Sequence, residues 1–467
     1  MEVSKPDIEQ EHTFTLKKLW KHMGPGWLMS IGYLDPGNLE SDLQTGVASG
    51  YSLLWLLFWS HVIGLIFQLL AAKLGTVTGK HLAQLIRQHY SPPLANILWA
   101  FTQLALIGAD MLEMVGTAIA LHIFLRCPVW VGVMMTSFDT ITFTMMQRYG
   151  MRHLEAIFMV LISLMAICFW LELIQSEPDL GQIVHGLLMP SVPRHAEFQA
   201  VAMVGAVVMP HNMFLHSALV ASREDKSPRQ LKQANLYIAL DSALALTVSF
   251  LVNLAIVVVF AQVFYQPDHK VELLGLGDAD AVLGKTLGFA AKYLWAAGLL
   301  AAGQSSTMTG SLAGRYVTEG FFGHVFDKEW HQMAITRALS IVPGMVVALF
   351  AVDHFDTMGE LLNVLQSICL PTVLIPIIKL CSSYAVLQDF KISFKLQLTC
   401  WCLITIVISL DIFLFIQHGQ SLGISRIINP AVFVYILFLI YIVWKPLNAV
   451  MEDGWIHLAR FDVPSSI

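Results

Sequence analysis

The chain has 467 residues, of which 56% are hydrophobic and only 13% are charged, with a formal net charge of −6. Soluble domains carry about 25% charged residues, and the mean hydropathy here is +0.65. This composition excludes an ordinary soluble protein, and we see no basic patch for nucleic acid. The six cysteines are scattered without CxxC spacing, so neither a zinc site nor a disulfide framework is predicted. We expect an all-α integral membrane protein embedded in a lipid bilayer.

Twelve segments are long and apolar enough to cross a membrane, which takes about 20 mostly apolar residues. The expected spans are 26–48, 52–74, 95–124, 128–146, 154–174, 199–221, 235–263, 282–312, 334–352, 358–384, 397–417 and 429–446. The loop 175–198 separates two halves of five spans each. We therefore divide the chain into an N-terminal tail (1–22), a first five-helix repeat (23–174), an extracellular linker (175–198), a second five-helix repeat (199–390), two additional helices (391–446) and a C-terminal tail (447–467).

The distribution of Lys and Arg sets the expected orientation, because cytoplasmic loops carry an excess of these residues. With the N-terminus inside, 21 of them fall on the cytoplasmic side and six on the outer side. An even number of spans then places both termini in the cytoplasm. The first span runs outward and the sixth runs inward, so the two are antiparallel.

Two strings of the same form interrupt the first and sixth spans, Asp-Pro-Gly-Asn at 35–38 and Met-Pro-His-Asn at 209–212. A proline inside a helix removes one backbone hydrogen bond and clashes with the preceding turn. At membrane depth such a break is tolerated only where it lines a cavity within the protein. Paired breaks in the two halves of a chain indicate the substrate site of a secondary transporter.

The residues at the breaks are of types that bind metal ions. Asp35 is a carboxylate near the middle of a span, where ionisable groups are functional candidates, and Asn38 adds an amide oxygen. The proline at 210 frees carbonyls before it, such as that of Ala206. Met209 adds a thioether, a soft donor suited to transition metals rather than Mg²⁺ or Ca²⁺. The alternative for Met209 is ordinary core packing.

A group of titratable side chains predicts a proton path beside this site. Asp110 and Glu113 lie one turn apart on one face of the third span, and two carboxylates at that depth do not both stay charged. His211 changes charge between pH 5 and 8, and Arg337 is a candidate counter-charge. The alternative for the carboxylates and Arg337 is a structural ion-pair network.

Five further polar residues have two open interpretations each. His216 lines the cavity or is a structural cap. Glu40, together with Asp42, lines the outer entrance or belongs to a solvated loop edge. In the tenth span Asn363 and Gln366 reach the ion or its waters, or they form hydrogen bonds between helices.

Three longer strings resemble the natural-resistance-associated macrophage protein family of divalent-metal transporters. GPGWLMSIGYLDPGNLESDLQTG at 24–46 resembles its first-helix signature and GAVVMPHNMFLHSAL at 205–219 its sixth. GQSSTMTGSLAGRYVTEGFFG at 303–323 is similar to the family's motif around the eighth helix, a string without a simple physical explanation of its own. The resemblance covers about residues 20 to 390.

This resemblance implies a bundle of the leucine-transporter type, with five plus five inverted helices, broken helices 1 and 6, and one or two added helices. It implies proton-coupled symport of Mn²⁺, Fe²⁺ and related ions such as Co²⁺, Cd²⁺ and Zn²⁺, without enzymatic activity or a cofactor. Carried over by motif, the metal ligands are Asp35, Asn38, the Ala206 carbonyl and Met209. The proton-linked residues are Asp35, Asp110, Glu113, His211 and Arg337. The chain departs from bacterial relatives at Asn363 and Cys369, where they usually have Gln.

We expect a monomer in the plasma membrane or in an endosomal or vacuolar membrane. Two alternatives stay open. A Na⁺-coupled small-solute symporter shares the expected fold, but such sites usually lack an Asp–Met pair. A non-transporting signalling relative carries a large soluble C-terminal domain, whereas only about twenty residues follow Lys445 here.

Overall fold

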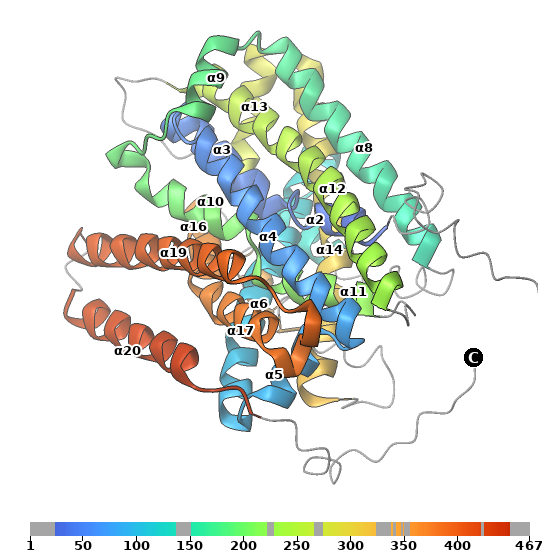
Figure 1. Ribbon diagram of the computed structural model, residues 1–467. Helices are drawn as coiled ribbons and strands as arrows, with labels where there is room; N and C mark the ends of the chain where they lie inside the picture. Colours follow the sequence, from blue (N-terminus) through green and yellow to red (C-terminus); the bar gives the residue numbers. More distant parts are fainter. Residues whose placement is uncertain are drawn as a thin grey trace, which may run out of the picture.

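The computed structural model describes residues 24–136, 151–221, 228–265, 274–323, 338–339, 342–346, 349, 355–421 and 425–448, and these are almost entirely α-helical (Figure 1). The helices of the first half are α2 (Pro25–Ile31), α3 (Pro36–Ser49), α4 (Leu54–Thr78), α5 (Leu82–His89), α6 (Pro92–Leu125), α8 (Met151–Gln175) and α9 (Leu180–Leu188). Those of the second half are η1 (Arg194–Ala196), α10 (Glu197–Val207), α11 (Pro210–Ala221), α12 (Pro228–Phe264), α13 (Leu276–Thr286), α14 (Phe289–Phe322), α16 (Phe355–Cys369), α17 (Pro371–Ser382), α18 (Tyr384–Leu387), η3 (Gln388–Phe390), α19 (Phe394–Ser421) and α20 (Ser425–Trp444).

Six stretches in the described part of the chain are long and apolar enough to cross a membrane. They are Leu54–Thr78, Pro92–Leu125, Arg194–Ala221, Gln230–Phe264, Thr357–Ser382 and Phe394–Ile416. The molecule is therefore a multi-pass membrane protein. The number twelve stays a prediction, because the expected spans at 128–146 and 334–352 lie largely outside the described residues.

The distribution of side chains is that of a protein surrounded by lipid: many large apolar side chains are exposed, and carboxylates are buried. Large apolar side chains lie on the outside, including Ile167 on α8 and Phe433 on α20, which are 58% and 61% exposed. Carboxylates such as Asp35, Asp42 and Glu113 are buried. Lipid cannot hydrogen-bond to polar groups, so polar side chains gather where protein surrounds them.

Two residues with no backbone N–H explain the two breaks at the centre of the bundle. Pro36 starts α3 after a four-residue gap from the end of α2, and Pro210 starts α11 after a two-residue gap from the end of α10. Each proline cannot continue the hydrogen-bond ladder of the helix before it. The expected division of the first and sixth spans is confirmed.

The first broken helix packs against α12, and the sixth packs against α4. Three hydrogen bonds hold α2 and the first break to α12. The Gly26 N–H donates to Asp241 Oδ2 at 2.7 Å, the Ser249 hydroxyl donates to the Ser30 carbonyl at 3.1 Å, and Asn253 Nδ2 donates to the Tyr33 carbonyl at 2.8 Å. These three hydrogen bonds thus join α2 and the segment after it to one helix, α12, in this structure.

The boundaries differ from expectation in three places. The linker 175–198 contains α9, which begins because Asp179 Oδ1 accepts a hydrogen bond from the Gly181 N–H at 2.8 Å. The span expected at 282–312 is two helices, and α14 starts only after Gly288, whose φ is 101°. The span expected at 358–384 is divided at Pro371, before which α16 ends.

The two additional helices lie together at one edge of the bundle (Figure 1), where α19 packs against α16, α17 and α20. A buried hydrogen bond of 2.6 Å from the Ser367 hydroxyl to Asp411 Oδ1 joins α19 to α16. α19 thus packs against α16 at the edge of the bundle, whereas the residues of the two breaks are buried in its interior.

Candidate metal site

The first break presents a carboxylate at the start of a helix. Asp35 is the residue before Pro36 and caps α3, with φ −78° and ψ 168°. Its Oδ1 accepts a hydrogen bond from the Asn38 N–H at 2.9 Å. Asp is a preferred residue at this position, because the first N–H groups of a helix have no partner within it. The local sequence therefore fixes the Asp35 side chain in place, where it is 1% exposed.

The second break presents a carbonyl and a thioether. α10 ends at Val207, and Val208 turns away from helical geometry with φ −103° and ψ 74°. The missing N–H of Pro210 belongs opposite the carbonyl four residues earlier, that of Ala206. Met209 lies between them in sequence and is 1% exposed. Both predicted ligands of the sixth helix are thus at the break.

Oxygen atoms from the two breaks meet at the Asn38 side chain. Asn38 Nδ2 donates to Asp35 Oδ1 at 2.6 Å and to the Ala206 carbonyl at 3.0 Å. Two acceptors from different helices therefore face one point, which a hydrogen-bond donor occupies. If the amide turns over, Asn38 Oδ1 faces the same point, and three oxygens surround it. That is an arrangement of ligands for a cation.

Two side-chain oxygens at this point have no hydrogen-bond partner within the part of the chain that the structure describes. They are Asp35 Oδ2 and Asn38 Oδ1, and both are buried. A buried polar atom without a partner costs free energy. A bound cation would supply the missing interaction, which fits the chemistry of the donor set.

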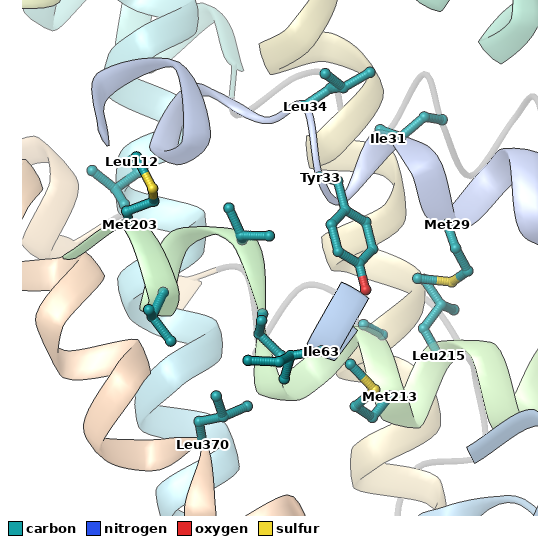
Figure 2. Close-up of a cluster of buried hydrophobic side chains, with 14 of the residues drawn as sticks. Met29, Ile31, Tyr33, Leu34, Ile63, Leu112, Met203, Met213, Leu215 and Leu370 are labelled. Atoms are coloured by element: carbon teal, nitrogen blue, oxygen red, sulfur yellow. The ribbon is translucent and has the colours of Figure 1, made fainter. Parts of the chain in front are cut away.

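Buried apolar side chains line the elements around the two breaks (Figure 2). The close-up shows Tyr33 and Leu34 from the first break, Met213 and Leu215 from α11, and Leu112 from α6. All five are buried. Such walls lower the local dielectric constant and strengthen any interaction between a carboxylate and a cation.

Asn363 on α16 borders the same site. Its Nδ2 donates to the Gly37 carbonyl at 3.0 Å. A Cβ added to Gly37 would lie 3.1 Å from Asp35 Oδ2 and 3.2 Å from Asn363 Oδ1, so these two oxygens face the same space. Gln366, one turn further, donates to Asn363 Oδ1 at 3.4 Å. The structure thus places Asn363 beside Asp35, with Gln366 behind it.

The carboxylate pair of α6 faces α14. A Cβ added to Gly310 would lie 3.1 Å from Asp110 Oδ1 and 3.3 Å from both carboxylate oxygens of Glu113. The two groups therefore share one face, as their spacing predicts, and both are buried. Arg337, the predicted counter-charge, lies outside the described residues.

The two histidines of the sixth helix have different surroundings. His211 is buried in the first turn of α11, two residues after Met209. His216 is fully buried, and its Nδ1 lies 3.1 Å from the Gln68 carbonyl on α4. This contact favours the structural interpretation of His216.

Glu40 and Asp42 are fully buried on α3, which contradicts the alternative of a solvated loop edge. Gln44 Nε2 donates to Glu40 Oε1 at 3.1 Å.

Sequence reasoning gave no role to Asn212, whose Nδ2 donates to the Gly32 carbonyl at 3.1 Å. The matching strings mark Asn212 as the counterpart of Asn38, but its partner Gly32 becomes visible only in the fold.

The model of a protein family described as natural resistance-associated macrophage protein-like matches residues 26–417. The chain belongs to this family, abbreviated Nramp. The resemblance inferred from the motifs is confirmed, and so is the expected all-α, multi-pass membrane fold.

Several Nramp relatives cover nearly the whole chain. The metal transporter nramp1 homolog of Dictyostelium discoideum is 46% identical over 426 residues, which are 90% of this chain and 79% of the relative. Natural resistance-associated macrophage protein 2 of Mus musculus is 41% identical over 95% of this chain and 84% of its own. Metal transporter Nramp4 of Arabidopsis thaliana is 41% identical over 93% of this chain and 87% of its own.

Among solved structures, a single-substitution variant of the Eremococcus coleocola manganese transporter superposes with a TM-score of 0.82 at 27% identity. The match covers 93% of this chain and 96% of that one. The inward-facing conformation of Mhp1 gives a TM-score of 0.53 at 16% identity, over 90% of this chain and 91% of that one. The second likeness concerns the fold alone.

Proposed function

We propose that this chain transports divalent transition-metal ions, Mn²⁺ and Fe²⁺ and related ions, across a membrane together with protons. The observation that carries the proposal is the meeting of Asp35 Oδ1 and the Ala206 carbonyl at one amide, 2.6 and 3.0 Å away, between two broken helices. Relatives named metal transporters and the manganese transporter structure support it. The chain is a transporter and not an enzyme.

Asp35, Asn38, the Ala206 carbonyl and Met209 hold the ion in this proposal. Bound Mn²⁺ or Fe²⁺ replaces the amide nitrogen of Asn38, which turns its oxygen inward. The Asp35 carboxylate supplies charge, and the two neutral oxygens keep binding weak enough for release. The Met209 thioether favours ions of softer character over Ca²⁺ and Mg²⁺. Asn363 faces the same space as Asp35, so it contacts a water molecule that stays bound to the ion in this proposal.

Asp110, Glu113 and His211, together with Asp35, carry the proton. The support is the shared face of the two carboxylates against Gly310 and the burial of His211 in the first turn of α11. Two neighbouring buried carboxylates do not both stay charged, so one of them exchanges a proton during the cycle. Arg337 is proposed as their counter-charge on the exit route.

The ion moves by alternating access, with the halves of the first and sixth helices moving at their breaks. Import, cytoplasmic termini and a monomeric state are part of the proposal. The Lys and Arg distribution supports the placement of the termini. The expected division into two repeats, a linker and two added helices stays part of the proposal. The membrane is the plasma membrane or an endosomal or vacuolar one.

Uptake into liposomes that contain a pH probe tests this function. We expect Mn²⁺ and Fe²⁺ to enter and acidify the interior, with Mg²⁺ and Ca²⁺ excluded. Asp35→Ala abolishes uptake. Glu172→Gln, a change at an equally buried carboxylate on α8, preserves it. Full activity of Asp35→Ala, or uptake that follows a Na⁺ gradient without acidification, contradicts the proposal.

A further inference from the structure

Asn212 joins the sixth helix to the end of the first half of helix 1. Its side chain is 1% exposed, and its Nδ2 donates to the Gly32 carbonyl at 3.1 Å. Gly32 is the residue after α2, and its carbonyl is the one that a helical N–H four residues later normally serves. That later residue is Pro36, which has no N–H. Asn212 therefore serves a carbonyl that the first break leaves without a helical partner.

The same relation holds in the opposite direction at the second break. Pro210 has no N–H for the Ala206 carbonyl, and Asn38 donates to that carbonyl at 3.0 Å. Asn38 and Asn212 each stand two residues after the proline of their own helix. Each asparagine thus donates to the carbonyl released by the proline of the other helix. The two hydrogen bonds form a reciprocal pair across the site.

The two members of this pair differ when an ion binds. In the proposed function, Asn38 and the Ala206 carbonyl turn to the ion, so the hydrogen bond between them is replaced by metal ligation. The bond from Asn212 to Gly32 involves no proposed ligand. It is the member of the pair that persists while the ion is enclosed.

We propose that Asn212 is a positioning residue that stabilises the closed arrangement of the two breaks through the Gly32 carbonyl. This inference rests on the proposed function. When the first half of helix 1 moves toward water, water satisfies that carbonyl. When the breaks close in an apolar interior, the Asn212 amide satisfies it, and a buried carbonyl without a partner is costly.

Gly32 offers a second way to disturb the same contact. A Cβ added there would lie 2.5 Å from Asn212 Nδ2 and 2.6 Å from Asn212 Oδ1. The backbone itself accepts a side chain, since φ is −67° and ψ is −3°. Gly32→Ala therefore acts on the protein through Asn212, and Asn212→Ala removes the atoms with which the added methyl group collides.

A double-mutant cycle with Mn²⁺ uptake and Mn²⁺ binding as readouts tests the inference. Asn212→Ala and Gly32→Ala each lower the maximal uptake rate about tenfold, because every crossing passes through the closed arrangement. The Kd for Mn²⁺ changes less than about threefold, since the ligands are intact. The rate of the double variant matches that of Asn212→Ala within about twofold, because both changes break one contact.

Asn253→Ala is the matched control. Asn253 also donates an amide hydrogen to a carbonyl of the first break, that of Tyr33 at 2.8 Å, but from α12. Its effect on the rate multiplies with that of Gly32→Ala, because the two contacts are separate.

Three results overturn the inference. They are a normal uptake rate for Asn212→Ala, a double variant of Asn212 and Gly32 that is about 100-fold slow, and a loss of Mn²⁺ binding as large as that of Asn38→Ala. Asp35→Ala distinguishes a failure of the inference about Asn212 from a failure of the proposed function. If it abolishes uptake while Asn212→Ala is normal, only the role of Asn212 fails. If it transports normally, the proposed function fails.

Discussion

At the scale of single residues, the candidate site combines a hard and a soft donor in equivalent positions. Asp35 and Met209 each stand directly before the proline of a break. A carboxylate alone binds Ca²⁺ and Mg²⁺ as well as Mn²⁺, whereas a thioether contributes little to hard ions. Selectivity is therefore expected to depend on Met209 and ion binding itself on Asp35.

Replacing Met209 by alanine tests this division. We expect Met209→Ala to retain Mn²⁺ uptake and to lower the selectivity for Mn²⁺ over Ca²⁺ by about tenfold, a change of about 1.4 kcal/mol. Uptake competition between the two ions measures it. Met213→Ala is the control, because Met213 is equally buried one turn further and lies in the apolar cluster of Figure 2. Equal selectivity in the two variants would show that Met209 only packs.

The sequence was sufficient to place Asp35, Asn38, Ala206 and Met209 at the two breaks, because prolines and polar or sulfur-containing side chains are conspicuous in apolar segments. It could not settle Asn363, whose position depends on how α16 approaches the break. The contact of Asn212 with Gly32 spans 180 residues, so no local pattern reveals it. Side-chain partners across helices come from tertiary packing, which a single sequence does not contain.

At the scale of elements, glycines on α14 explain the small-residue string at 303–323. Gly310 faces the carboxylates of Asp110 and Glu113, and a Cβ added to Gly303 would overlap Thr117 Oγ1 on α6. Small residues let two membrane helices approach closely. The string therefore sets the distance between α14 and the carboxylate pair.

Gly303→Ala is expected to force these two helices apart. Overpacking of this kind typically costs about 1–3 kcal/mol, which should lower the melting temperature of the detergent-solubilised protein by several degrees. Gly108→Ala on α6 is the control, because a Cβ there lies 3.6 Å from its nearest neighbour. If Gly303→Ala melts with the wild type, the close approach of α14 and α6 is not needed.

The short helix α5 predicts a pH dependence of stability. Burial lowers the pKa of His81, at its start, from 6.5 to about 4, and the His81 ring meets the Tyr316 ring edge-on at 6.0 Å. Between pH 6.5 and about pH 4, His81 binds a proton in the unfolded chain but not in the folded chain. The free energy of unfolding therefore falls as the pH falls through this range. The loss attributable to His81 is up to about 2 kcal/mol at pH 5.

Melting temperatures of wild type and His81→Gln at pH 7 and pH 5 measure this effect. We expect the wild type to lose more stability on acidification than the variant, which has no group to titrate at that position. An identical pH response of the two proteins would exclude a buried neutral histidine at position 81.

Apolar length predicted the long helices well but not the short ones. α9 and α13 have 9 and 11 residues, too few for a membrane span, and their limits depend on local features such as the Asp179 cap and Gly288. The division of the tenth span at Pro371 is visible in the sequence as a proline. The sequence nevertheless predicts one continuous span at 358–384, because apolar residues lie on both sides of the proline.

At the scale of the whole molecule, carboxylates and amides are buried in the interior, large apolar side chains cover much of the outside, and the broken helices pack against α12 and α4. α4 directly follows the broken helix of the first half, and α12 directly follows that of the second half. The expected inverted repeat therefore relates α4 and α12 to each other. In the proposed cycle, such a frame keeps the candidate ligands enclosed while the halves of the broken helices move. Transport in this arrangement therefore requires the ion to bind between the breaks.

Anomalous scattering from crystals of the protein with Mn²⁺ locates the ion directly. We predict a peak between the two breaks, about 2.0–2.6 Å from Asp35 Oδ1 and from the turned amide oxygen of Asn38, with Met209 and the Ala206 carbonyl facing it. Crystals of Asp35→Ala should lack the peak. A Mn²⁺ peak elsewhere in the protein, with none between the breaks, would contradict the account.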